Sequence, residues 1–140
     1  MPSHSKPEAV LFDLDGTLVD TASEFVTVVQ QMRRARNLEE LADQSIQSVV
    51  SDGAAGLIAL AFNCTPGMPG FDELRDEFLN AYEDQLGSSA QPYEGFRVLL
   101  QELSLQRIPW GVVTNKMRRF AEPLMTAMAF APPANALVTP

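Results

Sequence analysis

A chain of 140 residues, of which 46% are hydrophobic and 20% charged, is long enough for one folded domain with a buried core. Its formal net charge of −8 is opposite in sign to that of most nucleic-acid-binding proteins, so we expect no nucleic-acid partner. The single cysteine excludes an intrachain disulfide and favours a cytoplasmic location. We find no apolar run that approaches the roughly 20 residues of a membrane helix, so no membrane partner is expected.

The N-terminal part of the sequence predicts a strand, a sharp turn and a long helix. Residues 9–12 are continuously apolar, as in a strand that is covered on both faces of a parallel sheet, and Gly16 marks the turn that follows. Thr21 and Glu24 have the spacing of a capping box, in which each side chain bonds to the backbone near the other. Apolar residues then recur at helical spacing, which predicts a helix from Thr21 to about Arg36.

The middle of the sequence contains no convincing strand. Its predicted elements are a weak helix over 37–50, a short apolar helix over 53–62, a proline- and glycine-rich loop over 63–70, an amphipathic helix that contains residues 74–82 and ends near 87, and a linker over 87–92. This block is therefore expected to form a helical lobe.

The C-terminal part of the sequence alternates between helices and strands. The predicted elements are a helix over 96–103, a strand over 110–114, a helix over 120–128 and a third strand that begins at residue 136. Pro123 is expected either in the first turn of its helix or at a kink. Alternation of this kind predicts an α/β fold with a parallel sheet, into which the helical lobe is inserted.

Two acidic residues, Asp13 and Asp15, alternate with apolar residues at the end of the first predicted strand. With a side-chain period of two, both carboxylates point to the same side, about 6–7 Å apart, and they repel by roughly 2–3 kcal/mol at an effective dielectric constant near 20. We therefore expect a compensating cation, and Mg²⁺ suits oxygen ligands at a site that also holds phosphate. Alternatively, Asp15-Gly16 is a hairpin signal, and two short strands could form around it.

The residues at the end of the first predicted strand read Phe12-Asp13-Leu14-Asp15-Gly16-Thr17-Leu18-Val19-Asp20, and those at the end of the second read Val112-Val113-Thr114-Asn115-Lys116. The first run resembles the D-x-D-G-T motif of the haloacid-dehalogenase-like (HAD) phosphatases, and the second resembles that family's second motif. The runs 110–116 and 119–123 particularly resemble bacterial phosphoglycolate phosphatases and are also similar to N-acetylmuramic acid 6-phosphate phosphatases. The resemblance implies a partial Rossmann-like HAD core, formed by residues 1–19 and 91–140, and a helical cap formed by residues 20–90.

The same resemblance implies a magnesium-dependent phosphatase mechanism. Asp13 matches the aspartate that attacks phosphorus and becomes an aspartyl phosphate. Asp15 matches the aspartate that protonates the leaving alcohol and then activates water. Both are expected to hold Mg²⁺. The implied substrate is a small phosphorylated metabolite such as 2-phosphoglycolate, with an amino-sugar phosphate or a sugar-phosphate mutase reaction as alternatives.

Four further residues are expected to bind the phosphate group. Gly16 lets the backbone turn sharply, and Thr17 with nearby amides can line the phosphate pocket. Thr114 matches the family's hydroxyl residue that bonds to a phosphoryl oxygen, with the Asn115 amide beside it. Lys116 could add positive charge here, but a lysine after a strand is more often a surface residue, and we expect it at the surface.

The resemblance is incomplete at the C-terminal end. The family's third-motif lysine and fourth-motif acids have no match in this sequence, so the chain is expected to be truncated. Without the later strands, the strand before Asp13 would be an unprotected sheet edge. A second hypothesis follows, in which the chain is an inactive fragment that binds metal weakly or self-associates through this edge.

Overall fold

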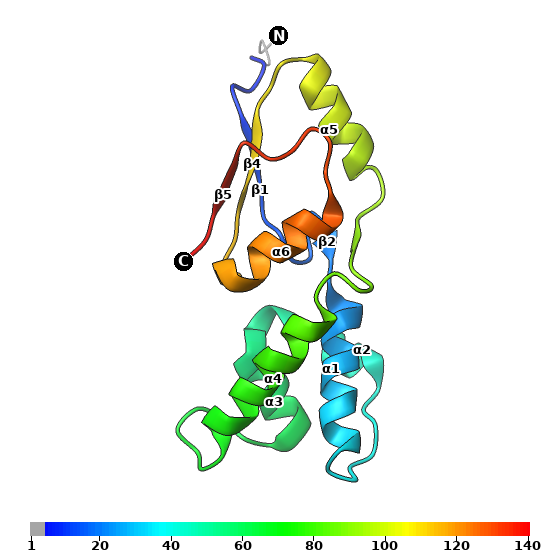
Figure 1. Cartoon of the computed structure of the whole chain (residues 1–140), viewed down its shortest axis with the longest axis vertical. Helices are drawn as coiled ribbons and strands as arrows, with labels where there is room; N and C mark the ends of the chain where they lie inside the picture. Colours follow the sequence, from blue (N-terminus) through cyan, green and yellow to red (C-terminus); the bar gives the residue numbers. More distant parts are fainter. Residues whose placement is uncertain (1–4) are drawn as a thin grey trace. The chain divides into compact units, whose positions relative to one another are not determined.

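A computed structural model describes residues 5–140 of the chain and divides it into two compact units (Figure 1). Unit 1 contains the residues up to Asp20 and those from Gln91 to Pro140, and unit 2 is Thr21–Ala90. These boundaries lie within one residue of those predicted for the core and the cap. Each unit is described by itself below.

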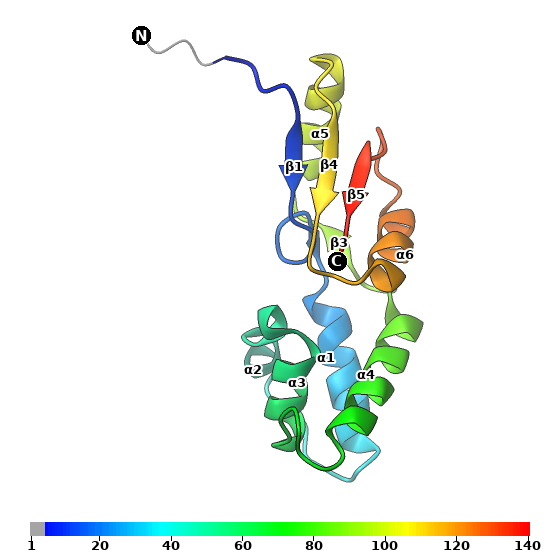
Figure 2. The ribbon, with the colours of Figure 1, turned by 90° about the vertical axis from the view of Figure 1, so that its left-hand side faces the viewer.

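A parallel sheet lies at the centre of unit 1 (Figure 2). Its strands are β1 (Val10–Phe12), β4 (Trp110–Val113) and β5 (Ala136–Val138), in the order β1-β4-β5. Phe12 is opposite Val112, which is opposite Leu137, so the three strands run side by side and end at the same edge of the sheet. The α/β prediction is confirmed.

Aromatic side chains form the core on one face of this sheet. The helices of unit 1 are α5 (Phe96–Leu105) and α6 (Arg118–Met128). The Phe12 ring makes edge contacts with Phe96 (centroids 5.3 Å apart) and with Trp110 (6.0 Å). The indole also makes an edge contact with Phe130 (centroids 5.7 Å apart), and its Nε1 donates a hydrogen bond of 3.2 Å to the carbonyl of Pro132. Figure 1 shows α5 along this side of the sheet. The buried indole is therefore the centre of the core of unit 1.

The opposite face of the sheet is apolar and exposed among the described residues. Leu11, Val113 and Val138 are 62%, 44% and 52% exposed. Between them lie Gly111 and Ala136, and a Cβ atom on Gly111 would come within 3.0 Å of the Ala136 carbonyl oxygen. The expectation that the first strand is covered on both faces is therefore wrong for these residues, because an apolar run does not say which neighbours cover it. The expected edge position is observed, since β1 is an outer strand.

A second, two-stranded sheet includes the last two residues of the segment predicted as a linker over 87–92. Strands β2 (Val19–Asp20) and β3 (Gln91–Pro92) pair antiparallel, with Val19 opposite Pro92 and Asp20 opposite Gln91. Two residues are too few for an alternating pattern, so the sequence gives no signal for these strands. The pairing fixes the start and the end of the inserted segment next to each other.

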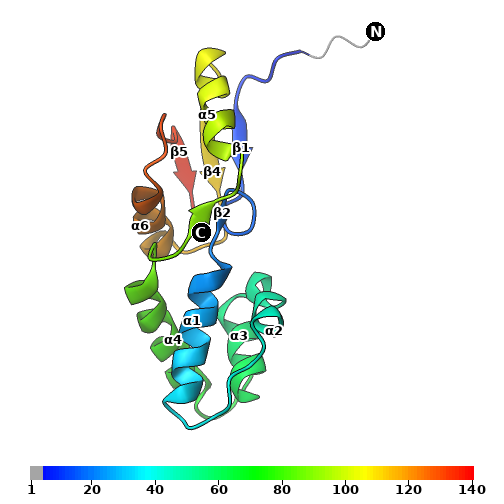
Figure 3. The same ribbon diagram turned by 90° about the vertical axis from the view of Figure 1, so that its right-hand side faces the viewer.

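Unit 2 is entirely helical, as predicted (Figure 3). Its elements are α1 (Ala22–Arg34), α2 (Asp43–Gln47), the 3₁₀ turn η1 (Val50–Asp52), α3 (Gly53–Phe62) and α4 (Phe71–Gln85). Stacked rings join α1 to α4: Phe25 lies 4.5 Å from Tyr82 and 6.2 Å from Phe78. Of the weak helix predicted over 37–50, only α2 and the beginning of η1 are helical, and Asn37 takes a left-handed conformation with φ 54°.

An ion pair also joins the segment after α1 to α4. The guanidinium of Arg36 donates to both carboxylate oxygens of Glu77, at 3.0 and 2.5 Å. These hydrogen bonds lower the pKa of Glu77 below its ordinary value. The side chains of Arg36 and Glu77 are 35% and 44% exposed, so water screens their charges, and we expect the pair to add little to the stability of the fold.

Half of the capping box predicted at the start of α1 is absent. Thr21 is the N-cap residue but makes no side-chain capping hydrogen bond. The Glu24 carboxylate is fully buried and accepts a hydrogen bond from the Gly87 N–H, and the hydroxyls of Ser23 and Ser89 lie 2.8 Å apart. Polar contacts thus join the first turn of α1 to the segment after α4.

The expectation that no apolar run reaches membrane-spanning length needs correction. By length and composition alone, the stretch Asp43–Phe62 is apolar enough to cross a membrane, a test that the core helix of a soluble protein also passes. In the structure this stretch consists of α2, η1 and α3, and the chain turns at Gly53 with φ 71°. The absence of a membrane partner stays a prediction.

Candidate active site

The first group of predicted site residues lies in a tight turn directly after β1. The strand ends at Phe12, so Asp13 is the first residue beyond it, and its side chain is exposed. Asp15 is half-buried within the turn, and the backbone N–H groups of Leu18 and Val19 both donate to the Leu14 carbonyl at 3.1 Å. The alternative hairpin does not form: β1 pairs with β4, and the residues that would return along β1 pair as β2 with β3.

Gly16 is needed in this turn for its backbone conformation. Its φ is +78°, which residues with a side chain rarely adopt, while a Cβ atom there would meet no other atom within 4 Å. Its N–H donates to the Val19 carbonyl at 3.0 Å, and the N–H of Thr17 donates to the Leu14 carbonyl at 3.3 Å. The Thr17 side chain is exposed. The glycine thus allows the chain to reverse immediately after the two aspartates.

The second group of predicted site residues follows β4, the neighbour of β1 in the sheet. Thr114 is 7% exposed, and its N–H donates to the Val138 carbonyl at 3.0 Å. Asn115 comes next and is exposed. Because parallel strands end at the same edge of a sheet, the register places this group beside the turn that contains Asp15.

Lys116 joins the two groups. Its Nζ donates a hydrogen bond of 2.9 Å to Oδ1 of Asp15, a residue 101 positions away in the sequence. Its backbone N–H donates to Oγ1 of Thr114 at 3.0 Å. The side chain is only 6% exposed, so the expectation of a surface lysine is wrong. The signal that could have found it is the unmet need of the two carboxylates for a cation.

The charges at this site are therefore partly balanced by the chain itself. Within residues 5–140, no group of three or more histidine, cysteine, aspartate or glutamate side chains is arranged to hold a metal ion. Asp13 and Asp15 remain as two carboxylates at the strand end, one of them paired with a lysine. Two carboxylates with waters or phosphate oxygens are a usual environment for Mg²⁺.

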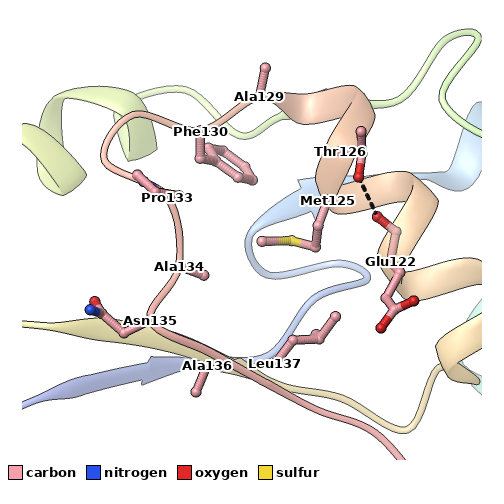
Figure 4. Close-up of a pocket in the computed structure, with 10 residues that line it drawn as sticks. All are labelled: Glu122, Met125, Thr126, Ala129, Phe130, Pro133, Ala134, Asn135, Ala136 and Leu137. Carbon is pink, nitrogen blue, oxygen red and sulfur yellow. Dashed lines mark hydrogen bonds between the residues drawn. The ribbon is translucent and has the colours of Figure 1, made fainter.

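A pocket of about 590 Å³ lies elsewhere in unit 1 (Figure 4). It opens between the end of α6, the loop that follows and β5, and its residues are Glu122, Met125, Thr126, Ala129, Phe130, Pro133, Ala134, Asn135, Ala136 and Leu137. None of the predicted site residues lines it. The Thr126 hydroxyl donates to the Glu122 carbonyl at 3.0 Å, and most of the remaining lining is apolar. Nothing in this lining resembles a phosphate site.

The two motifs that converge at the sheet edge are matched together by one protein family. The model of the haloacid dehalogenase-like hydrolases matches residues 10–138. This chain belongs to the haloacid dehalogenase-like hydrolase family. The match includes both the turn with Asp13 and the strand end with Thr114, as well as the inserted helices.

Curated relatives of this HAD chain carry the names of phosphatases. It is 42% identical over 133 residues to the N-acetylmuramic acid 6-phosphate phosphatase of Pseudomonas aeruginosa, covering 95% of this chain and 59% of that protein. It is 37% identical over 124 residues to the phosphoglycolate phosphatase of Xanthomonas campestris pv. campestris, covering 89% of this chain and 56% of that protein. The HAD chain thus spans somewhat more than half the length of these relatives.

A solved structure shares the fold of the HAD chain. The crystal structure of a "predicted phosphoglycolate phosphatase" from Haemophilus somnus 129pt superposes with a TM-score of 0.81, covers 97% of this chain and 64% of that chain, and is 21% identical in sequence. At this identity the likeness shows the fold. The partial Rossmann-like core that the resemblance implied is confirmed.

Proposed function

We propose that this chain carries the reacting carboxylates of a phosphomonoester hydrolase that works through an aspartyl phosphate. The observation that supports the proposal most directly is the contact of Lys116 with both Asp15 and Thr114. It joins the two family motifs at the carboxyl edge of a parallel sheet, where open α/β sheets bind their ligands. Membership in a hydrolase family and relatives named as phosphatases support the same reaction class.

In the first proposed step, a carboxylate oxygen of Asp13 attacks the phosphorus of the substrate. The bond between phosphorus and the ester oxygen breaks, and Asp15, which enters this step in its protonated form, gives its proton to the leaving alcohol. The exposed position of Asp13 beyond the end of β1 makes its carboxylate accessible to a substrate. Covalent catalysis of this kind divides one difficult displacement into two easier ones.

In the second proposed step, Asp15 takes a proton from water while the water oxygen attacks phosphorus. The bond between phosphorus and Asp13 breaks, inorganic phosphate leaves and both aspartates return to their starting state. The backbone N–H groups of Gly16 and Thr17 donate hydrogen bonds within the turn, so we propose that these two groups stabilise the shape of the loop. The side chains of Thr17 and Asn115 are exposed, and we propose that they contact the substrate. The Thr114 hydroxyl is proposed to donate to a phosphoryl oxygen.

The residues at the strand end fit Mg²⁺. Asp13 offers an exposed carboxylate and Asp15 a second one, and Mg²⁺ is commonly held by one or two carboxylates together with substrate phosphate. When bound, the ion supplies positive charge that offsets the repulsion between Asp13 and the phosphoryl oxygens. We propose that Asp13 and Asp15 hold it.

The substrate is proposed to be a small phosphorylated metabolite. Relatives named for N-acetylmuramic acid 6-phosphate and for phosphoglycolate are 42% and 37% identical, which supports testing both compounds. A sugar-phosphate mutase reaction is distinguished by isomerised sugar phosphate in place of free phosphate. The single, buried Cys64 supports a cytoplasmic location.

Phosphate release by the 140-residue chain tests the proposed function. With 2-phosphoglycolate or N-acetylmuramic acid 6-phosphate as substrate, we expect release that depends on Mg²⁺, falls to background with a chelator and returns when Mg²⁺ is added in excess. Activity that is unaffected by the chelator would contradict the magnesium assignment. No release from either compound, or from a general phosphomonoester, would contradict the proposal for this chain.

A second candidate role is self-association without catalysis. The observation that favours it is the exposed edge strand β1, whose Leu11 lies 62% exposed on an apolar sheet face. In sedimentation velocity we expect a concentration-dependent dimer that the substitution Leu11→Lys returns to monomer, because a charge blocks close approach of the two faces. The matched control is Leu105→Lys, at a leucine that is 77% exposed on α5. A chain that is monomeric at all concentrations would exclude this role.

A further inference from the structure

The side chain of Lys116 is buried, and a buried ammonium group needs a negatively charged partner. Its side chain is 6% exposed, and burying an unpaired ammonium group costs several kcal/mol. The pair with Asp15, at 2.9 Å, meets this demand and fixes the position of one carboxylate oxygen. The other lysine of the chain, Lys6, is exposed and donates to the Gln106 carbonyl. The two lysines therefore differ sharply in environment.

The backbone of Lys116 orients a second site residue. Its N–H donates to Oγ1 of Thr114 and so takes one acceptor position of that hydroxyl. This hydrogen bond uses an oxygen lone pair and not the hydroxyl hydrogen of Thr114, a residue that is 7% exposed. The hydroxyl is thus left with a hydrogen to donate, which is what bonding to a phosphoryl oxygen requires.

We propose that Lys116 is a positioning residue of the catalytic site, which holds Asp15 through its ammonium group and Thr114 through its backbone N–H. The proposal rests on the proposed function, since it assigns Asp15 and Thr114 their roles there. It differs from the assignment of a phosphate-binding lysine, because the contact observed for Nζ is with Asp15. A residue that acts through others changes the rate of the chemical step more than the binding of substrate.

The kinetic test compares Lys116→Met and Lys116→Arg with the unchanged chain, using p-nitrophenyl phosphate and Mg²⁺. We expect Lys116→Met to lower kcat about 100-fold while KM changes by less than about threefold, since loss of the ion pair misplaces Asp15 without removing a substrate contact. Lys116→Arg should recover much of kcat, because it keeps a cation that can reach a carboxylate. Lys6→Met is the matched control and should leave both constants unchanged.

The opposite kinetic result would overturn the proposal. A rise in KM with kcat unchanged would make Lys116 a substrate-binding residue, and an unchanged kcat and KM would make it dispensable. Circular dichroism of each variant separates loss of folding from loss of positioning. If Lys116→Met does not fold, the reactivity measurement described next carries the test, because its first comparison uses the unchanged chain.

A second measurement does not depend on activity. Acetylation with an amine-reactive ester, followed by mass spectrometry, should modify Lys6 rapidly and Lys116 slowly, and Asp15→Asn should make Lys116 more reactive. Equal reactivity of the two lysines in the unchanged chain would overturn the ion pair and the proposal with it. Protection of Lys116 in a chain that releases no phosphate would instead overturn the proposed function, leaving the ion pair in place without a catalytic role.

Discussion

Replacing Asp13 with asparagine is expected to lower phosphate release by about 10³-fold or more, because an amide cannot attack phosphorus. The substitution keeps the size of the side chain, and Asp13 is exposed beyond the end of β1, so the fold should be unaffected. The measurement is the initial rate of phosphate release at saturating Mg²⁺. Acid quenching during turnover should also trap a phosphorylated chain, whose mass increase is absent in the Asp13→Asn variant.

The matched control for this prediction is Asp20→Asn. Asp20 is another exposed aspartate of the same segment, and it lies on β2 rather than in the turn after β1. Its substitution removes the same charge from the chain, so a general electrostatic effect would appear in both variants. Full activity in Asp13→Asn, or equal losses in the two variants, would show that Asp13 is not the nucleophile.

The largest loss of stability is expected for Trp110→Ala, at about 3–5 kcal/mol of unfolding free energy. The indole is 2% exposed, contacts the rings of Phe12 and Phe130 and donates a hydrogen bond to the Pro132 carbonyl. Its removal leaves a cavity on the packed face of the sheet and an unpaired carbonyl. Urea unfolding followed by circular dichroism measures the change, since the variant has no tryptophan left for fluorescence.

Leu105→Ala provides the comparison for this stability prediction. Leu105 is apolar as well but 77% exposed, so its truncation should change the unfolding free energy by less than about 0.5 kcal/mol. A loss below about 1 kcal/mol for Trp110→Ala would mean that the core of unit 1 is not organised around this residue. Unit 2 has its own aromatic cluster, so the two units can unfold at different urea concentrations, and signals from both should be fitted.

The sequence was sufficient to predict the elements with a clear apolar pattern. The strand before Asp13 and the strand from Trp110 are short apolar runs, and α1 and α4 have apolar residues at helical spacing; all four are observed close to the predicted positions. The strands β2 and β3 were missed because two residues carry no period. The bare face that contains Leu11 was missed because an apolar run gives no information on what covers it.

The candidate site was predicted only as far as local motifs reach. Asp13, Asp15 and Thr114 were identified from their runs, and the parallel pairing of β1 and β4 brings those runs to one edge. The role of Lys116 depends on a contact across 101 positions, which no local pattern encodes. A lysine after a strand is ordinary by itself, and its burial is evident only once the fold places Asp15 beside it.

The pairing of β2 with β3 has a consequence for engineering and for evolution. Because Asp20 is opposite Gln91, the chain departs from unit 1 and comes back to it at neighbouring positions of one small ladder. A short reverse turn could therefore replace the whole of Thr21–Ala90 without altering any strand of the parallel sheet. The same arrangement lets insertions of very different size or sequence be exchanged at this point. The turn with Asp13 and Asp15 would still be held between β1 and β2 by their strand pairing.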